Sequence, residues 1–399
     1  MNGAIAGLLL LQALAPAEGS GGLTLEAALQ MADRASSARA IALEVDRARA
    51  ALKSAGQFPN PEISLGREKA GDVETGLTVS QGLPFTGRLS LERAAARRGV
   101  HAAEAQMKQA RLELRARVRE AFVDVLAQQE RQKVIEAGLA QLDELVRVLR
   151  AGENEGESSG FDRMRSERER AEVAADLYDA RARLAHARAA LAAPLGITPT
   201  ALTTLGALAL GAPLPTVEAA RAQASARSDL MALRTQAEQQ DLLARAAARR
   251  VIPEPMLAAG RKTSEADGTR GQGPIFGLSL AFPLFDRGQG ARAIAEAEGH
   301  LLRTRQQALE NRLPAEAAAA VSDAEARREA EATYAPAADP DALVRIARAA
   351  YAEGEMRILE LLDAYRTALA ARLRIIELRG QARKAEIAID VATGVERIR

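Results

Sequence analysis

The sequence predicts a mainly helical protein with a small β part, built from two structural repeats. Three observations lead to this fold class. Ala, Leu, Arg and Glu dominate the 399 residues, aromatic residues make up only 3%, and Trp and Cys are absent, which is the composition of long helices. Two short motifs each occur twice, about half a chain apart. A long run with helical periodicity follows each copy.

The repeat consists of two extended segments followed by a very long helix. Residues 59–67 return as residues 253–261, and residues 79–88 return as residues 278–287. Such a duplication has to be recognised first, because it makes each half one structural unit. We therefore expect one elongated molecule of two similar halves, although the length alone would allow two or three compact domains.

The first residues resemble a secretory signal. Residues 4–14 are a short apolar core, and Ala15-Pro16-Ala17 supplies a cleavage site of the A-x-A type, so residues 1–17 are assigned to a signal peptide. The apolar core is shorter than the roughly 20 residues that a membrane-spanning helix needs. No Lys or Arg precedes it. A buried N-terminal segment is therefore the alternative.

Charge and composition exclude several classes of function. The formal net charge of +1 gives no field to attract nucleic acid. Without Cys the chain has no disulfide, thiolate metal site or lipidated N-terminal cysteine. Motifs of hydrolases, nucleotide-binding proteins and zinc proteases are missing, so we expect neither an enzyme nor a cofactor. His101, His186 and His300 lie far apart on predicted helices, and no metal site is expected from them.

The first repeat is assigned to residues 18–196 and begins with a helix that ends near residue 56. The β-hairpin 59–84 follows, because Pro59 and Pro61 favour extended backbone. Apolar and polar residues alternate at 62–66 and again at 77–80, and a polar turn is expected over 66–76. Alternation with a period of two is typical of a barrel strand between lipid and water, but also of a hairpin in a soluble protein.

The rest of the first repeat is predicted to be a helical hairpin. Residues 89–150 contain no proline and carry an apolar stripe, which predicts a rod of roughly 90 Å. A rod of that length needs neighbouring helices along its whole length to bury the stripe. The glycine-rich turn 151–160 forms the tip, and a return helix covers 161–193.

The second repeat is assigned to residues 216–399, after a linker over 197–215 with proline and glycine. It is expected to contain a helix over 216–250, the hairpin 255–283, a long helix over 288–350, a tip turn at 351–358 and a return helix over 358–394. Within the long helix, Pro314 predicts a kink, and Pro336 and Pro340 predict an interruption.

No window supplies about 20 uninterrupted apolar residues after the N-terminus, so any passage through a membrane must use closed β-structure. Four strands cannot close a barrel, since about eight is the smallest closed form. Either several chains pool their strands, or the hairpins never meet lipid.

The order of elements and three motifs resemble the outer-membrane efflux channel family, the TolC-like proteins. The motifs are Leu83-Pro84-Phe85-Thr86-Gly87-Arg88, Phe282-Pro283-Leu284-Phe285-Asp286-Arg287-Gly288, and Tyr351-Ala352-Glu353-Gly354 with the following Glu360-Leu361-Leu362-Asp363. The resemblance implies a homotrimer in the cell outer membrane. Each chain would give four strands to a twelve-strand barrel and its helices to a long periplasmic tunnel.

The resemblance also implies partners and a role. The channel would be the passive exit duct of a tripartite efflux system, with a periplasmic adaptor and a proton-driven inner-membrane pump. Ala193-Pro194-Leu195-Gly196 and the short loops are most similar to the heavy-metal branch, the cobalt–zinc–cadmium type. The competing hypothesis is a soluble coiled-coil scaffold of the periplasm, which the absence of Trp favours, because barrels usually carry aromatic girdles.

Matching motifs residue by residue implies three groups of working residues. The periplasmic aperture or gate would use Asp162, Tyr351, Glu360 and Asp363. The tip turns that dock the adaptor would contain Gly156, Gly160, Gly354 and Arg357. The barrel–tunnel junction would contain Pro84, Gly87, Arg88, Pro283, Asp286 and Arg287.

The gate and junction groups each have a simpler interpretation. Three copies of Glu360 and Asp363 around a pore would concentrate cations, but two acids three residues apart are also an ordinary solvated helix face. Met356 stands where the family has a basic residue, which puts the closed-state contacts in doubt. Arg88 and Arg287 would sit at a lipid headgroup boundary, or would be ordinary charges at helix starts.

Overall fold

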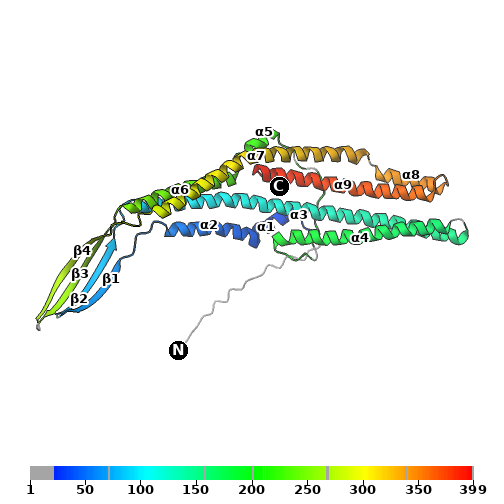
Figure 1. Cartoon of the computed structure of the whole chain (residues 1–399). Helices are drawn as coiled ribbons and strands as arrows, with labels where there is room; N and C mark the ends of the chain where they lie inside the picture. Colours follow the sequence, from blue (N-terminus) through cyan, green and yellow to red (C-terminus); the bar gives the residue numbers. More distant parts are fainter. Residues whose placement is uncertain are drawn as a thin grey trace, which may run out of the picture.

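The computed structural model describes residues 22–70, 72–156, 159–199, 202–209, 211, 213–266, 269–337 and 339–397. The assigned signal peptide lies outside these residues. Figure 1 shows an elongated molecule with a β-sheet at one end and helical tips at the other. The helix α3 (Arg88–Glu155) runs from the sheet to the far tip, and its 68 residues make a rod of about 100 Å.

Each half contributes a hairpin of strands and a hairpin of helices. The first half contains α1 (Leu25–Arg34), α2 (Ser36–Ser54), β1 (Glu62–Ala70), β2 (Asp72–Gly82), α3 and α4 (Gly160–Leu195). The second half contains α5 (Val217–Ala224), α6 (Ser228–Ala248), the short 3-10 helix η2 (Arg249–Val251), β3 (Pro255–Ala266), β4 (Thr269–Leu280), α7 (Gln289–Ala337), α8 (Pro340–Ala352) and α9 (Ile358–Thr393). The return helices α4 and α9 have equal lengths of 36 residues.

The four strands form one antiparallel sheet in the order β1-β2-β3-β4. The two hairpins join through β2 and β3, so residues that are far apart in the sequence become neighbours, as in the pair Val79 and Ala259. Among the described strands, β1 and β4 each have one unpaired edge. No described helix has both the length and the hydropathy that crossing a membrane requires.

Three apolar clusters lie along the rod. One lies at the far tips and joins α3 and α4 to α8 and α9, with Ile135, Val173 and Leu361 at its centre. A second joins α1, α3, α4 and the end of α9, and a third joins α5, α6, α7 and α9. The segments of the two halves therefore share their cores. The three clusters bury the apolar stripes of the long helices, so the molecule has no single central core.

Several predicted boundaries are corrected by the structure. The polar stretch 66–76 is not a turn, because β1 and β2 stay paired as far as Ala70 and Asp72. The helix α3 continues to Glu155, so the first tip is shorter than predicted, and Gly160 already belongs to α4. The second tip turn is likewise shorter than 351–358, since α8 includes Tyr351 and Ala352.

Three predicted helices are each divided in the structure. The first breaks at Ala35, whose backbone is extended. The helix over 216–250 breaks between α5 and α6, where Ser225 is the C-cap of α5 and its hydroxyl donates to the Arg221 carbonyl. The helix over 288–350 breaks before Pro340, one of the two prolines at which an interruption was predicted; Pro340 begins α8 and needs no amide hydrogen there. Pro314 and Pro336 both lie inside α7, whose axis bends in Figure 1.

Candidate functional site

The sheet has one apolar and one polar face. Paired residues of an antiparallel sheet share a face, and the register places Ile63, Val79, Ala259 and Phe276 in one row. We call this side the apolar face; its apolar members are Ile63, Leu65, Val73, Leu77, Val79, Pro255, Leu257, Ala259, Pro274, Phe276, Leu278 and Leu280. Leu65 is 76% exposed and Phe276 is 82% exposed. The opposite side, the polar face, carries mostly Ser, Thr, Gly and charged residues.

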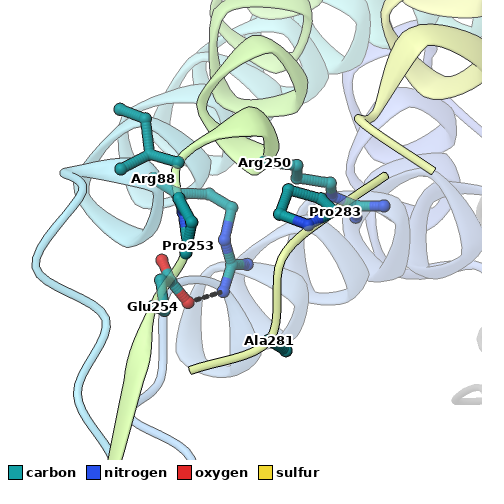
Figure 2. A pocket seen from close by; sticks show the side chains of 7 residues that line it. Arg88, Arg250, Pro253, Glu254, Ala281 and Pro283 are labelled. Carbon is teal, nitrogen blue, oxygen red and sulfur yellow. Dashed lines mark hydrogen bonds and ion pairs between the residues drawn. The ribbon is translucent and has the colours of Figure 1, made fainter. Parts of the chain in front are cut away.

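The junction between sheet and helices is tied by contacts between the two halves. Figure 2 shows Arg88, the first residue of α3, beside Glu254 in the segment before β3. An Arg88 guanidinium nitrogen lies 3.2 Å from a Glu254 carboxylate oxygen, and the Thr86 hydroxyl donates to the same carboxylate at 2.7 Å. Arg88 also pairs with Glu92 at 2.9 Å. Sequence reasoning missed Glu254 because its partners lie 168 and 166 residues away.

An open cavity of about 340 Å³ lies beside this contact (Figure 2). The residues that line it are Arg88, Arg250, Ile252, Pro253, Glu254, Ala281 and Pro283. Of the predicted junction residues it thus includes Arg88 and Pro283. Pro84 is part of the adjoining turn, where the Leu83 amide donates to the Pro255 carbonyl at 2.8 Å.

The two junctions use the same backbone turn but different side chains. Gly87 and Gly288 precede α3 and α7 with positive φ of 77° and 80°. In the second junction the Asp286 carboxylate accepts from the Gly288 amide at 2.9 Å, and the Arg287 side chain donates to the Leu284 carbonyl at 3.3 Å. Asp286 and Arg287 therefore shape their own turn, whereas Arg88 links the two halves.

The predicted gate residues lie at the far tips, but in different surroundings. Asp162 is in the first turn of α4, and Tyr351 is in the last turn of α8. Partial burial, and secondly the charge of Asp162, raise the pKa of Tyr351 above its ordinary value. Asp162 and Tyr351 therefore lie near enough across the two tips for the carboxylate charge to act on the phenol.

Glu360 and Asp363 have surroundings that differ from those of Asp162 and Tyr351. The Glu360 carboxylate accepts from the Arg357 amide at 2.9 Å, so it caps the start of α9. Asp363 is exposed on the next turn. Its charge is felt by Arg366, whose pKa is raised first by a hydrogen bond to Glu169. Of the two acids, Asp363 alone has a carboxylate that is not used in a helix cap.

The Glu169–Arg366 pair is a contact that sequence reasoning missed. The Arg366 Nε lies 2.6 Å from a Glu169 oxygen, and the Glu169 side chain is 7% exposed. The pair joins α4 to α9 near the tips. The two residues stand 197 positions apart, close to the spacing of the internal repeat, which was the one sequence signal that could have indicated it.

The tip glycines shape the turns. Gly156 ends α3 with φ of 81°, and Gly354 follows α8 with φ of 76°. No described atom lies within 4 Å of a Cβ built on either residue, so both turns face open space. Gly160 begins α4, and Arg357 precedes α9. These four residues mark the ends of the two helical hairpins.

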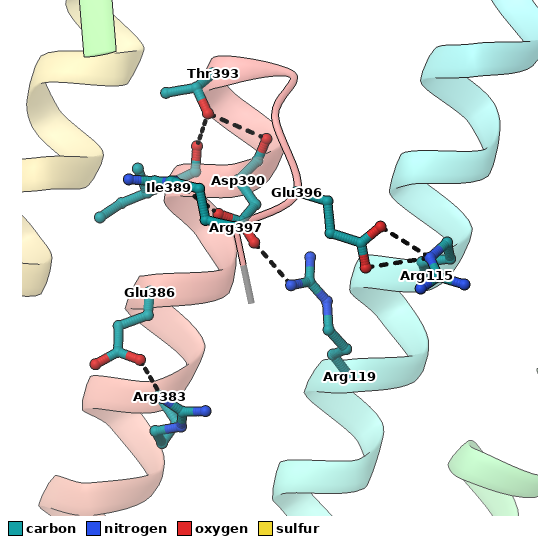
Figure 3. A network of polar contacts seen from close by, with 9 residues as sticks. All are labelled: Arg115, Arg119, Arg383, Glu386, Ile389, Asp390, Thr393, Glu396 and Arg397. Carbon is teal, nitrogen blue, oxygen red and sulfur yellow. Dashed lines mark hydrogen bonds and ion pairs between the residues drawn. The ribbon is translucent and has the colours of Figure 1, made fainter. Parts of the chain in front are cut away.

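A network of ion pairs fastens the end of the chain to α3 (Figure 3). Arg119 and Asp390 lie 2.7 Å apart, and each side chain is only 1% exposed. Arg397 reaches the same carboxylate at 3.1 Å. Arg115 contacts Glu396 at 2.9 Å. The segment after α9 is therefore held against the middle of the rod.

No cluster of three or more metal-ligating side chains occurs within the described part of the chain. His101 lies near Glu104 at 3.6 Å, and both side chains are partly exposed.

Comparison with known proteins finds similarity to one family and to one curated relative over most of the chain. Residues 27–197 match the model of a family described as outer membrane efflux protein. A relative, the cobalt-zinc-cadmium resistance protein CzcC of Cupriavidus metallidurans, is 28% identical over 95% of this chain and 92% of its own length.

Solved structures share the fold. The outer-membrane channel OprN has a TM-score of 0.76 at 20% identity, over 93% of this chain and 90% of that chain. CusC, whose structures concern folding and transmembrane channel formation, has a TM-score of 0.75 at 20% identity, over 93% of this chain and 92% of that chain. These likenesses confirm the predicted fold class.

Proposed function

Because this chain belongs to the outer membrane efflux protein family, we propose that it is the exit channel of a three-part export system. The family places it in the outer membrane and among transport proteins, so the prediction that it is not an enzyme is confirmed. In the proposal, a proton-driven pump of the inner membrane supplies the energy. A periplasmic adaptor joins the pump to the helical tips.

One observation carries this proposal: the sheet at the end of the rod has a solvent-exposed apolar face and two unpaired edges. In lipid each unpaired backbone group costs several kcal/mol. Three chains would pair β1 of one with β4 of the next and close a ring. The soluble scaffold, in contrast, would leave Phe276, Leu278 and Leu65 in water.

The helical tips are the proposed periplasmic mouth. We place the opening of the mouth between Asp162 at the start of α4 and Tyr351 at the end of α8, so a larger separation of these two tips would widen it. Asp363 supplies an exposed carboxylate near the same end. The turns at Gly156, Gly160, Gly354 and Arg357 are the surfaces offered to the adaptor, because they end the rods.

Heavy-metal cations are the proposed cargo. The relative CzcC is named for resistance to cobalt, zinc and cadmium. The polar face of the sheet, which would line the pore, carries Glu62, Glu68 and Glu74 against one cation, Lys262. Rings of carboxylates in a pore attract cations and disfavour anions.

Planar bilayers test both parts of this proposal. The purified protein should form conducting units that prefer cations. Glu68→Gln removes a carboxylate from the polar face and should reduce that preference, whereas Glu265→Gln, on the apolar face of the same sheet, should leave it unchanged. Absence of conductance would refute the channel. Equal selectivity of wild type and Glu68→Gln would show that the Glu68 carboxylate does not contribute to the preference for cations.

The cargo is tested in cells. In a strain that lacks its own channel, expression of this protein with a cognate pump and adaptor should restore growth in Zn²⁺, Co²⁺ or Cd²⁺. Growth that stays as poor as with an empty vector, while a known channel restores it, would reject these cations.

A further inference from the structure

The end of the sheet that carries the hairpin turns has cations on the apolar face. Four exposed residues lie on the apolar face near the hairpin turns: Arg67, Lys69, Arg261 and Arg270. We call them the cationic belt. None of them forms an ion pair with any described side chain. They are therefore available to a ligand outside the protein.

The register sets the belt next to the apolar rows. Arg261 lies in the same row as Leu65 and Leu77, and beyond this row Val73 is the one apolar side chain among the described residues of the face. Arg67 lies one row further, and Lys69 and Arg270 lie two rows further. At about 3.4 Å per residue, Lys69 is roughly 14 Å beyond Leu65. The belt thus begins where the apolar surface ends.

Charges at this end of the sheet are sorted by face. On the apolar face Glu265 is the one described acid among the four cations. On the polar face at the same height, Glu68 and Glu74 outnumber Lys262, and Lys262 pairs with Glu74. A strand end that needed charge only for solubility would carry both signs on both faces. The sorting indicates an anionic partner on the outward side.

We propose that the cationic belt binds the phosphate groups of lipids in the outer leaflet, while their acyl chains lie on the apolar rows. This inference rests on the proposed channel, because it needs the apolar face in hydrocarbon. With the helical rods in the periplasm, the hairpin turns point to the cell exterior (Figure 1). Lipid phosphates lie just outside the hydrocarbon, which is the height of Arg261 and Arg67.

Cations next to an exposed apolar surface fit a lipid, which has both a phosphate group and acyl chains. A free anion would gain nothing from the adjoining Leu65 and Phe276, which are exposed by 76% and 82%. A second protein chain would have to cover the apolar rows that the membrane already covers. Each cation near an anionic lipid surface contributes about fivefold in affinity, which is about 1 kcal/mol.

The test uses the detergent-purified full-length channel and native mass spectrometry. The protein is titrated with bisphosphorylated lipid A and, in parallel, with its dephosphorylated form, which has the same acyl chains. Arg261→Gln is compared with Lys262→Gln, because these neighbours lie on opposite faces of β3. A variant that changes all four belt residues to Gln extends the series.

We expect the wild type to bind the bisphosphorylated lipid in preference to the dephosphorylated one. Arg261→Gln should weaken that binding about fivefold and the fourfold variant by more than about 50-fold, whereas Lys262→Gln should not change it. If the fourfold variant fails to assemble, the comparison of Arg261→Gln with Lys262→Gln decides.

Three results would overturn the proposal: equal binding of the two lipids, equal weakening by the two single variants, or full displacement of the lipid by millimolar inorganic phosphate. In each case wild-type conductance in bilayers would leave the channel function standing. Loss of conductance in the wild type would instead strike the channel function itself.

Discussion

At the scale of the residue, two acids one helical turn apart differ in role. Glu360 caps α9 by accepting from the Arg357 amide, and Asp363 is exposed with no such bond. A helix start leaves amide hydrogens without partners, so a carboxylate there stabilises the fold. Neighbouring positions in a sequence therefore do not imply a shared function at the mouth.

Glu360→Ala should destabilise the protein by about 1 kcal/mol, because the cap of α9 is lost. Glu360→Gln keeps an acceptor and should lie near the wild type. Asp363→Ala should leave stability unchanged and reduce the preference of the pore for cations. Thermal unfolding followed by circular dichroism, together with bilayer recordings, separates these effects. A stability loss in Asp363→Ala as large as in Glu360→Ala would contradict the assignment.

Tyr351 gives the tips a response to alkaline pH. Its pKa is raised, so the folded state holds the phenol proton more tightly than the unfolded state does. The associated stability is present below about pH 10, the ordinary pKa of tyrosine, and is lost as pH rises through the higher pKa of the folded state.

The phenolate absorbance, taken as the difference between wild type and Tyr351→Phe, should show this elevated pKa. Asp162→Asn should lower the pKa of Tyr351 towards the ordinary value, although burial, the larger cause, would persist. An identical titration of Tyr351 in Asp162→Asn would show that the two side chains do not interact.

The ion pair between Arg119 and Asp390 is buried, so removing one partner should lower the stability of the protein. Asp390→Leu would leave the Arg119 guanidinium, 1% exposed, without this carboxylate, and should destabilise the protein by about 3–5 kcal/mol. The double variant Arg119→Met/Asp390→Leu should recover part of that loss, since no charge of the pair stays buried. Unfolding in urea measures both. A double variant that is less stable than Asp390→Leu would contradict this expectation.

At the scale of the element, the turns that precede the long helices have the same backbone conformation in both halves, but their side-chain contacts differ. Gly87 and Gly288 have nearly equal positive φ before α3 and α7. A Cβ at Gly288 would lie 2.2 Å from the Ala247 carbonyl oxygen, whereas at Gly87 the nearest atom is the Ser90 hydroxyl at 3.8 Å. The turn is common to both halves, but its packing is not.

Gly87→Ala should therefore cost about 1–2 kcal/mol from backbone strain alone. Gly288→Ala should cost more, because the carbonyl of Ala247 must also move. The difference in melting temperature between the two variants measures the effect of packing. Equal melting temperatures would show that the Ala247 carbonyl moves without a loss of stability.

The sequence allowed the fold class to be predicted, because periodicity and the internal repeat are local signals. The long α3 has no proline, and the alternation at Ile63 and Leu65 marks a strand. The extent of β1 and β2 was missed, since charged residues such as Arg67 resemble a turn when the sheet around them is unknown. The contacts of Glu254 and Glu169 were missed, because their partners lie more than 160 residues away, and only the pair of Glu169 has a spacing close to that of the repeat.

At the scale of the whole molecule, a single chain contains the strands and helices of the fold, but its four described strands do not form a closed barrel. Helical hairpins form one end and an incomplete sheet forms the other (Figure 1). The apolar face of the sheet, its unpaired edges and the family all agree with a ring built from several chains. Since four strands are too few for a closed barrel, function depends on assembly.

The mass of the detergent-purified particle, measured by native mass spectrometry, tests this dependence most directly. We expect three copies of the mature chain in one particle, stable only in detergent or lipid. A single folded chain that stays in aqueous buffer without detergent would contradict it.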